Sequence, residues 1–350
     1  MKRPVPQMTG TDVPGDEPSE RSVAFGFEDV ANEDVHWPSV RARLAEVGAT
    51  AVTLAVGRAD WLAFPWASAS KWESSAVAGT GRDFVAEALA ELDGLAATLV
   101  VDALAPRAIS LDPGIAGRTA DGESSPDFLS VSALDGGYFG THLEAMCREV
   151  ARRYRPERIA LTELMFDDAT FSRDDLAHFV RHTGRPGFPL AKNGEIDVNH
   201  PDIHRWRCES LVRLLGRVSG QVAEFDVRVD MDVRVPWGNP DGDRADSGHD
   251  YALLLESVDR IVVWNYFALA DADPSYGADL TRSLLRRFGD RFVISTGLWS
   301  REDGVVSPED MTTSLRAVAA AGGRSVSVIP TSLMAEEHWE ALAELWAGAP

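Results

Sequence analysis

Residues 226–234 read Asp-Val-Arg-Val-Asp-Met-Asp-Val-Arg, with apolar and charged side chains in strict alternation. A period of two predicts a β-strand, because successive side chains of a strand point to opposite faces of the sheet. The apolar face has to pack against helices, so the charged face is expected to point away from them, to the inside of a closed sheet. This stretch is one of eight short strand patterns along the chain, each followed by an amphipathic helical pattern.

The other seven predicted strands are rich in β-branched or aromatic residues and cover residues 23–27, 51–56, 98–102, 158–163, 260–266, 291–296 and 325–329. Eight strand-helix units in one chain predict an α/β fold, a single (β/α)8 or TIM barrel. The connections from helix to strand are short, whereas the loops that leave the strands are long at 57–81, 103–137 and 164–200. Active sites of such barrels lie at the C-terminal ends of the strands, so we expect the functional residues there.

The length of 350 residues fits one barrel domain, which we expect over residues 22–350, after a disordered tail at 1–21. The tail lacks the apolar region of a signal peptide, and no stretch reaches the roughly 20 apolar residues of a membrane span. We therefore expect a cytoplasmic protein, or a secreted one if a signal segment has been removed. The net charge of -21 argues against nucleic acid as a partner. Cysteine and histidine spacings indicate no metal site, and we expect no cofactor.

Carboxylates cluster at two of the predicted strand ends. In the run Thr-Glu-Leu-Met-Phe-Asp-Asp, the acids Glu163, Asp167 and Asp168 come at the exit of the fourth strand. Like charges held close together raise the pKa of one acid while a neighbour stays ionised, which prepares a general acid. Asp230 and Asp232 lie on the inner face of the fifth strand. Buried charges are costly unless they are paired or used, so both are candidate catalytic residues, with an internal ion pair between Arg228 and an acid as the alternative.

Aromatic and hydrogen-bonding side chains gather at the same strand exits. Six of the ten tryptophans fall in outgoing loops or at strand ends. There, flat amphipathic rings suit the apolar faces of sugars. Polar neighbours of these rings are expected to bind sugar hydroxyl groups. The candidate substrate-binding residues are Arg58, Asp60, Trp61, Trp66, Trp264, Asn265, Tyr266 and Trp299. We therefore expect a carbohydrate as the partner of this chain.

The run Leu-Met-Phe-Asp-Asp-Ala at 164–169, with Trp206 and Arg207 on a long helix before the fifth strand, resembles glycoside-hydrolase-like barrels of bacterial polysaccharide enzymes. It is similar to the C-terminal hydrolase domain of the poly-N-acetylglucosamine export deacetylases, whose fourth strand ends in a similar Asp-Asp-Ala motif. The architectural resemblance covers residues 22–347. It implies that Asp167 and Asp168 are catalytic or substrate-contacting acids. The pattern of retaining enzymes, Asn-Glu after the fourth strand and Glu after the seventh, is absent.

These features predict a glycoside hydrolase in which Asp168 or Glu163 protonates the leaving oxygen. Asp232 or Asp230 would activate water or stabilise an oxocarbenium-like transition state. Two alternatives stand beside this prediction. The acids Glu163, Asp168, Asp230 and Asp232 together offer hard oxygen ligands for Mg²⁺ or Mn²⁺, as in a metal-dependent lyase or aldolase. The other alternative is a catalytically silent barrel that binds a glycan through its tryptophan-lined mouth.

Overall fold

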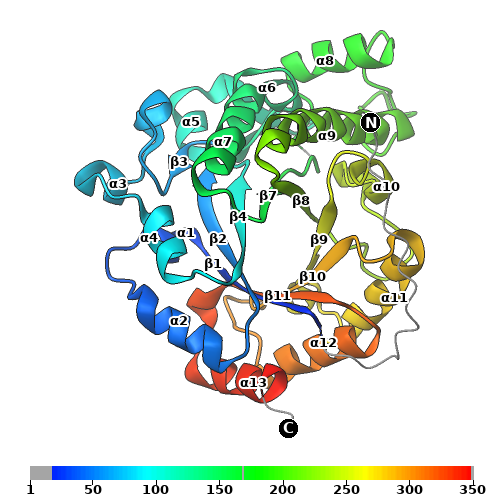
Figure 1. Cartoon of the computed structure of the whole chain (residues 1–350). Coiled ribbons are helices and arrows are strands. Elements are labelled where there is room, and N and C mark those ends of the chain that lie inside the picture. Colours follow the sequence, from blue (N-terminus) through cyan, green and yellow to red (C-terminus); the bar gives the residue numbers. More distant parts are fainter. Residues whose placement is uncertain (1–17, 168, 348–350) are drawn as a thin grey trace.

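The structure is a computed structural model that describes residues 18–167 and 169–347. In this part of the chain, eight parallel strands close into a barrel surrounded by helices, so the predicted (β/α)8 barrel is confirmed (Figure 1). The barrel closes between its first and last strands, where Glu20 pairs with Ser325 and Val23 with Val328. The first strand also pairs with the second, and each later barrel strand pairs with the next one along the chain, always in parallel.

The barrel strands are β1 (Glu20–Phe25), β2 (Ala51–Arg58), β4 (Ala96–Asp102), β7 (Arg158–Thr162), β8 (Arg228–Val233), β9 (Arg260–Asn265), β10 (Phe292–Gly297) and β11 (Ser325–Ile329). Short strands in the outgoing loops are β3 (Trp61–Leu62), β5 (Ala116–Arg118) and β6 (Ser124–Leu129). The α-helices are α1 (Phe27–Val30), α2 (Trp37–Glu46), α3 (Ser75–Thr80), α4 (Phe84–Glu91), α5 (Pro106–Leu111), α6 (Val131–Leu134), α7 (Tyr138–Tyr154), α8 (Arg173–Thr183), α9 (Pro201–Val222), α10 (Tyr251–Leu254), α11 (Tyr276–Phe288), α12 (Pro308–Ala320) and α13 (Glu336–Trp346). Short 3-10 turns cover η1 (Ala67–Trp72), η2 (Pro113–Ile115), η3 (Ala223–Phe225), η4 (Ala245–Ser247), η5 (Phe267–Ala270) and η6 (Thr331–Leu333).

The alternating stretch forms β8 and divides its side chains between two environments. Val229, Met231 and Val233 are fully buried in the hydrophobic core, whereas Asp230 and Asp232 line the inside of the barrel. The two acids of this strand therefore face inward, as the alternation predicts, whereas Arg228 at its start is exposed and paired with Glu157. The strand begins at Arg228, because Asp226 has a left-handed backbone, φ 61°, at the end of the preceding 3-10 turn.

The start of the barrel differs from the prediction. β1 begins at Glu20, so residues 20 and 21 belong to the barrel and not to a tail. The Glu20 carboxylate accepts hydrogen bonds from Arg260 at 2.5 Å and from Ser325 at 3.1 Å. These partners are more than 200 residues away in the chain. The residues next to Glu20 therefore give no sign of the pairing and read as a solvated segment. The disordered tail expected over residues 1–17 lies outside the described residues.

Capping signals set the helix starts and leave the strand exits in loops. Ser172 and Asp175 form a capping box at the start of α8, and Ser307 caps α12 with proline at its first position. The residues between β7 and α8 are therefore free of helical hydrogen bonding. Within residues 18–167 and 169–347, no helix combines the length and the apolar character that crossing a membrane requires.

Candidate active site

The inside of the barrel holds a cavity of about 260 Å³ that all eight barrel strands line. Small side chains on the inner faces of the strands leave this space, among them Ser22, Ala55, Ala160, Ser295 and Ser327. Barrels of this type usually fill the same layers with bulky branched residues. The small residues therefore provide room for a ligand where most barrels have packed core.

Three carboxyl groups from three neighbouring strands line this cavity. Asp102 ends β4, Glu163 directly follows β7, and Asp232 lies on β8. The strand register pairs Asp102 with Thr162, the residue before Glu163, so the two acids lie at the same level of the barrel. The cluster thus unites two of the predicted catalytic acids with a third that the sequence analysis did not select.

Burial raises the pKa of all three carboxyl groups. The pKa of Glu163 rises to about 8, because the group is buried and because Asp102 and Asp232 repel its negative charge. Burial raises the pKa of Asp102 to about 7, with nearby acids adding to the rise. Burial also raises the pKa of Asp232 to about 7, although hydrogen bonds with Thr162 and Trp264 favour its charged form. At neutral pH the cluster therefore keeps protons that isolated carboxyl groups lose.

The backbone of Glu163 is left-handed, with φ 56°, a conformation that residues other than glycine rarely adopt. A histidine from the loop after β8 holds the neighbouring main chain. His249 Nε2 donates to the carbonyl of Leu164 at 2.8 Å, and its Nδ1 accepts from the backbone N–H of Arg234 at 3.1 Å. Burial lowers the pKa of His249 to about 4, so the ring stays neutral and keeps both hydrogen bonds. We call this arrangement the His249 clamp.

An aromatic wall flanks the carboxyl groups and also lines the cavity. Trp264 stacks on Tyr266 with ring centres 5.5 Å apart at 10°, and Tyr266 contacts Trp299 at 5.2 Å. Gly297 at the end of β10 makes room for this packing, because a Cβ atom there would lie 2.3 Å from the Tyr266 ring. Three of the predicted substrate-binding residues are thus brought together beside the acids.

Asp230, a fourth predicted acid, lies at the deeper end of the cavity and is fully buried. Its carboxylate accepts hydrogen bonds from Arg158 and from Arg260, each at 2.8 Å. Asp230 thus forms an internal ion pair, the predicted alternative to catalysis, but its partners are arginines of β7 and β9, whereas the expected partner Arg228 is paired with Glu157. Both oxygens of Asp230 are therefore engaged, which argues against a role in proton transfer or in holding a metal ion.

Asp167 and Asp168 follow in the loop after β7. The carboxylate of Asp167 is paired with Arg234 and accepts a hydrogen bond from the Ser247 hydroxyl. Asp167 is thus anchored to the loop after β8 and does not line the cavity. Asp168 lies outside the described residues, and its catalytic role stays a prediction.

Two more of the predicted substrate-binding residues, Arg58 and Trp61, lie beside the cavity. They line a hollow of about 410 Å³, here called the side hollow, together with Phe27, Glu28, Ala31, Ser74, Ser75 and Ala76. Phe27 and Glu28 also line the barrel cavity. The side hollow therefore adjoins the mouth of the barrel.

The remaining three predicted substrate-binding residues line neither space. Asp60 is fully buried, and its carboxylate accepts from the backbone N–H groups at the start of α5. Trp66 is buried and stacks on His142 with ring centres 5.5 Å apart. Asn265 is buried and donates a hydrogen bond to Ser314 on α12 at 3.0 Å. These side chains hold the outgoing loops and a helix in place. Their position at a strand exit is the same as that of a ligand-binding residue, so the sequence alone does not separate the two roles.

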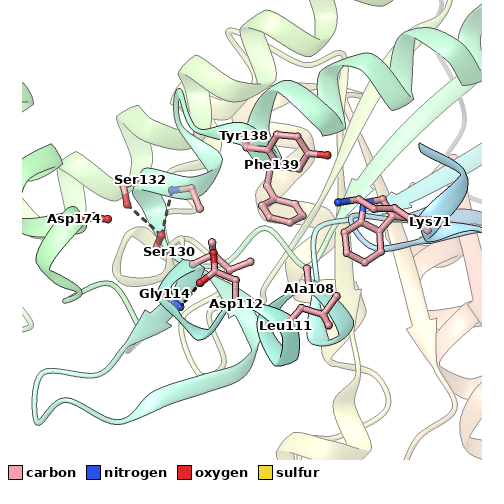
Figure 2. A pocket seen from close by; sticks show the side chains of 13 residues that line it. Lys71, Ala108, Leu111, Asp112, Gly114, Ser130, Ser132, Tyr138, Phe139 and Asp174 are labelled. Carbon is pink, nitrogen blue, oxygen red and sulfur yellow. Dashed lines mark hydrogen bonds between the residues drawn. The ribbon is translucent and has the colours of Figure 1, made fainter. Parts of the chain in front are cut away.

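A separate hollow of about 470 Å³ lies between the loops after β2 and β4 (Figure 2). Its floor includes the buried rings of Trp72 and Phe139, and Figure 2 shows Lys71 and Asp174 on opposite sides of it. The two acidic side chains of this hollow, Asp112 and Asp174, are exposed. The cluster of buried, mutually repelling carboxyl groups lies in the barrel, so we place the candidate chemistry there.

One group of side chains has the composition of a cation site. Asp135, His178 and His182 bring a carboxylate and two imidazole rings within 4.8 Å of one another. The indole N–H of Trp206 donates to His178 Nδ1 at 2.9 Å, so the neutral ring carries its proton on Nε2 and offers no lone pair there. Asp135 is also paired with two arginines of α9. These contacts favour a structural ion-pair network over a metal site.

The member of the carboxyl cluster that was missed had a usable signal. Asp102 is the last residue of the predicted strand 98–102, the same kind of position that selected Glu163. It stands alone among apolar residues, whereas the acids of the fourth and fifth strands occur in clusters. The His249 clamp had no local signal, because its partners come from two different loops.

No protein-family model matches this sequence, and no curated protein matches it. Solved structures do share its fold. The PgaB (BpsB) glycoside hydrolase domain from Bordetella bronchiseptica superposes with a TM-score of 0.68 at 16% identity, over 94% of this chain and 99% of that one. The catalytic domain of β-amylase from Paenibacillus polymyxa gives 0.61 at 14% identity, over 94% and 98% of the two chains. A chitinase from Chromobacterium violaceum gives 0.54 at 9% identity, over 95% and 100%. At these identities the likeness concerns the fold alone, and this chain is a (β/α)8 barrel similar in fold to these three structures.

Proposed function

We propose that this chain is a glycoside hydrolase that cleaves a polysaccharide or oligosaccharide by carboxyl acid-base catalysis. The observation that carries the proposal is the cluster of Asp102, Glu163 and Asp232, with raised pKa values, in a cavity beside an aromatic wall. Its fold neighbours, which are named as a glycoside hydrolase domain, an amylase and a chitinase, support the same reaction class.

Glu163 is the general acid in this proposal. Its pKa of about 8 keeps the carboxyl protonated at neutral pH, so it can donate a proton to the glycosidic oxygen that leaves. A proton donor has to meet its acceptor at hydrogen-bond distance, and the His249 clamp holds the main chain next to Glu163 in one conformation. The rare backbone conformation of Glu163 is consistent with such a site, because strained residues concentrate where geometry matters for function.

Asp232 is the second carboxyl of the reaction. When ionised, it either takes a proton from the water that attacks the anomeric carbon or stabilises the positive charge that develops there. Hydrogen bonds with Thr162 and Trp264 favour its charged form and fix its orientation. In the hydrolysis, the proton of Glu163 goes to the leaving sugar and the elements of water are added across the broken bond.

Asp102 acts on Glu163 through its charge. One of its oxygens accepts a hydrogen bond from the backbone N–H of Leu104 at 2.6 Å, which fixes the carboxyl in place. Its negative charge raises the pKa of Glu163. We therefore assign Asp102 a tuning role, with proton transfer left to Glu163 and Asp232.

The aromatic wall supplies the binding surface. The rings of Trp264, Tyr266 and Trp299 pack against one another, and all three border the cavity. Sugar rings have apolar C–H faces that stack on such platforms, while their hydroxyl groups need hydrogen-bond partners at the edges. A cavity that combines both features suits a pyranose unit placed next to the carboxyl groups.

The test is hydrolysis of a panel of bacterial and plant polysaccharides, with released oligosaccharides identified by mass spectrometry. The wild-type chain is compared with Glu163→Gln, Asp232→Asn, Asp102→Asn and Asp168→Asn. Asp174→Asn, at an exposed acid of the separate hollow, serves as the matched control. We expect Glu163→Gln and Asp232→Asn to reduce turnover by roughly 100-fold or more, and the control to keep wild-type turnover.

Two results would redirect the proposal. Sugar binding without turnover in the wild-type chain would favour the catalytically silent barrel. Turnover that persists in Glu163→Gln and in Asp232→Asn but disappears in Asp168→Asn would move the general acid to the motif that the family resemblance singled out.

A further inference from the structure

The side hollow continues the barrel cavity at one edge of its mouth. The two spaces share Phe27 and Glu28, which follow β1. A chain of sugar units that occupies the cavity therefore has an adjoining space of about 410 Å³ available without any rearrangement. The separate hollow of Figure 2 shares no lining residue with the cavity, so it lacks this continuity.

A hairpin between β2 and β3 builds one wall of the side hollow. Arg58 and Trp61 are paired across this antiparallel hairpin, and such cross-strand partners project from the same face of a sheet. Trp61 is partly exposed, and its ring meets Phe27 edge to face at 5.0 Å. The indole is thus held next to a residue that also borders the cavity.

Arg58 is held in a fixed orientation by a buried partner. Its Nε donates to Asp60 at 2.9 Å, and Asp60 is fully buried and anchored to the start of α5. The Arg58 side chain is 24% exposed, and its terminal nitrogens form no hydrogen bond with another residue of the described ranges. A guanidinium fixed through Nε offers these remaining N–H groups to a ligand in a preset geometry.

We propose that the side hollow is a second sugar-binding subsite, so that the substrate is a chain bound by at least two units and not a small glycoside. Trp61 provides an apolar face, Arg58 provides donors, and the Glu28 carboxylate and the Ser75 hydroxyl provide acceptors. Because Arg58 is already balanced by Asp60, this set suits the hydroxyl groups of a neutral sugar better than a charged group. The subsite rests on the proposed function, since the reacting bond is placed in the adjoining cavity.

The experiment measures binding of cello-, chito- and malto-oligosaccharides of two to six units by calorimetry. The protein is the full chain with Glu163→Gln, so that turnover does not consume the ligand. We expect affinity to rise with chain length for one of the three series. Adding Trp61→Ala should reduce the gain between two and six units by about tenfold, and Trp61→Phe should restore part of it.

Tyr138→Ala is the matched control, because Tyr138 is an exposed aromatic residue of the separate hollow. It should leave the length dependence at the level of the Glu163→Gln chain. The subsite is overturned if affinity does not rise with length, if no series binds, or if Trp61→Ala lowers affinity equally for every length. Length-dependent binding that needs Trp61, without turnover by the wild-type chain, would keep the subsite and reject the hydrolase. If turnover needs Glu163 but the dependence of affinity on chain length is unchanged by Trp61→Ala, the hydrolase is kept and the subsite is rejected.

Discussion

Replacing Glu163 by glutamine should stabilise the fold, and increasingly so as the pH rises. A carboxyl whose folded pKa of about 8 exceeds its ordinary value of 4.5 holds its proton more tightly in the folded state. Its contribution to stability is therefore complete below pH 4.5 and is lost as the pH rises to about 8. The interval corresponds to at most about 5 kcal/mol, at about 1.4 kcal/mol per pH unit. Because the side chain is partly open to the cavity, we expect about 2 kcal/mol.

The assay is urea denaturation of wild type and Glu163→Gln, followed by tryptophan fluorescence at pH values from 4.5 to 9. The difference in the free energy of unfolding should be near zero at pH 4.5, should grow in favour of the variant, and should level off above pH 8. Glu123→Gln, at an exposed position in the turn between β5 and β6, is the control and should follow the wild type. Parallel curves for Glu163→Gln and wild type across this range would refute the buried, proton-holding carboxyl.

Four further outcomes follow from the same structure. The plot of kcat/KM against pH should be bell-shaped with a maximum at about 7.5, because Asp232 ionises at about 7 and Glu163 loses its proton at about 8; a flat profile from pH 5 to 9 would contradict these roles. Asp230→Asn should lower the free energy of unfolding by about 3 kcal/mol, measured by urea denaturation, because it unbalances two buried arginines. Gly297→Ala should displace Tyr266 and lower turnover by roughly tenfold or more, with a change in tryptophan emission; unchanged emission and turnover would show that the wall tolerates the extra carbon. Dialysis against a chelator should leave turnover unchanged, whereas its loss would favour the metal-dependent lyase.

The barrel was predictable because its evidence is local and repeated. The alternation around Met231 and the short apolar runs of the other strands can each be recognised from neighbouring residues alone. Eight such strands, each followed by a helix, predict a closed barrel. The start of β1 was not predictable, since Glu20 depends on Arg260, which is distant in the chain. The ends of strands were harder to predict than their centres for the same reason, because the terminal residues of a strand contact partners from other loops.

The candidate site was predictable in its location but only partly in its members. Glu163 and Asp232 reach the cavity as their strand positions suggest, whereas Asp230, two residues before Asp232 on the same face, is taken up by an ion pair. Alternation predicts that Asp230 and Asp232 project from the same face of β8. It does not predict which partners each side chain meets at its own depth in the barrel. In the same way Asn265 follows Trp264 directly and points to a helix instead, because neighbours on a strand face opposite sides.

The His249 clamp grips its neighbouring loops only by main-chain atoms, the carbonyl of Leu164 and the N–H of Arg234. Every residue type except proline offers both of these groups, so the side chains at positions 164 and 234 can change without breaking these two hydrogen bonds. Substitutions at these two positions can therefore alter the surface beside Glu163 while the hold on its neighbouring main chain remains.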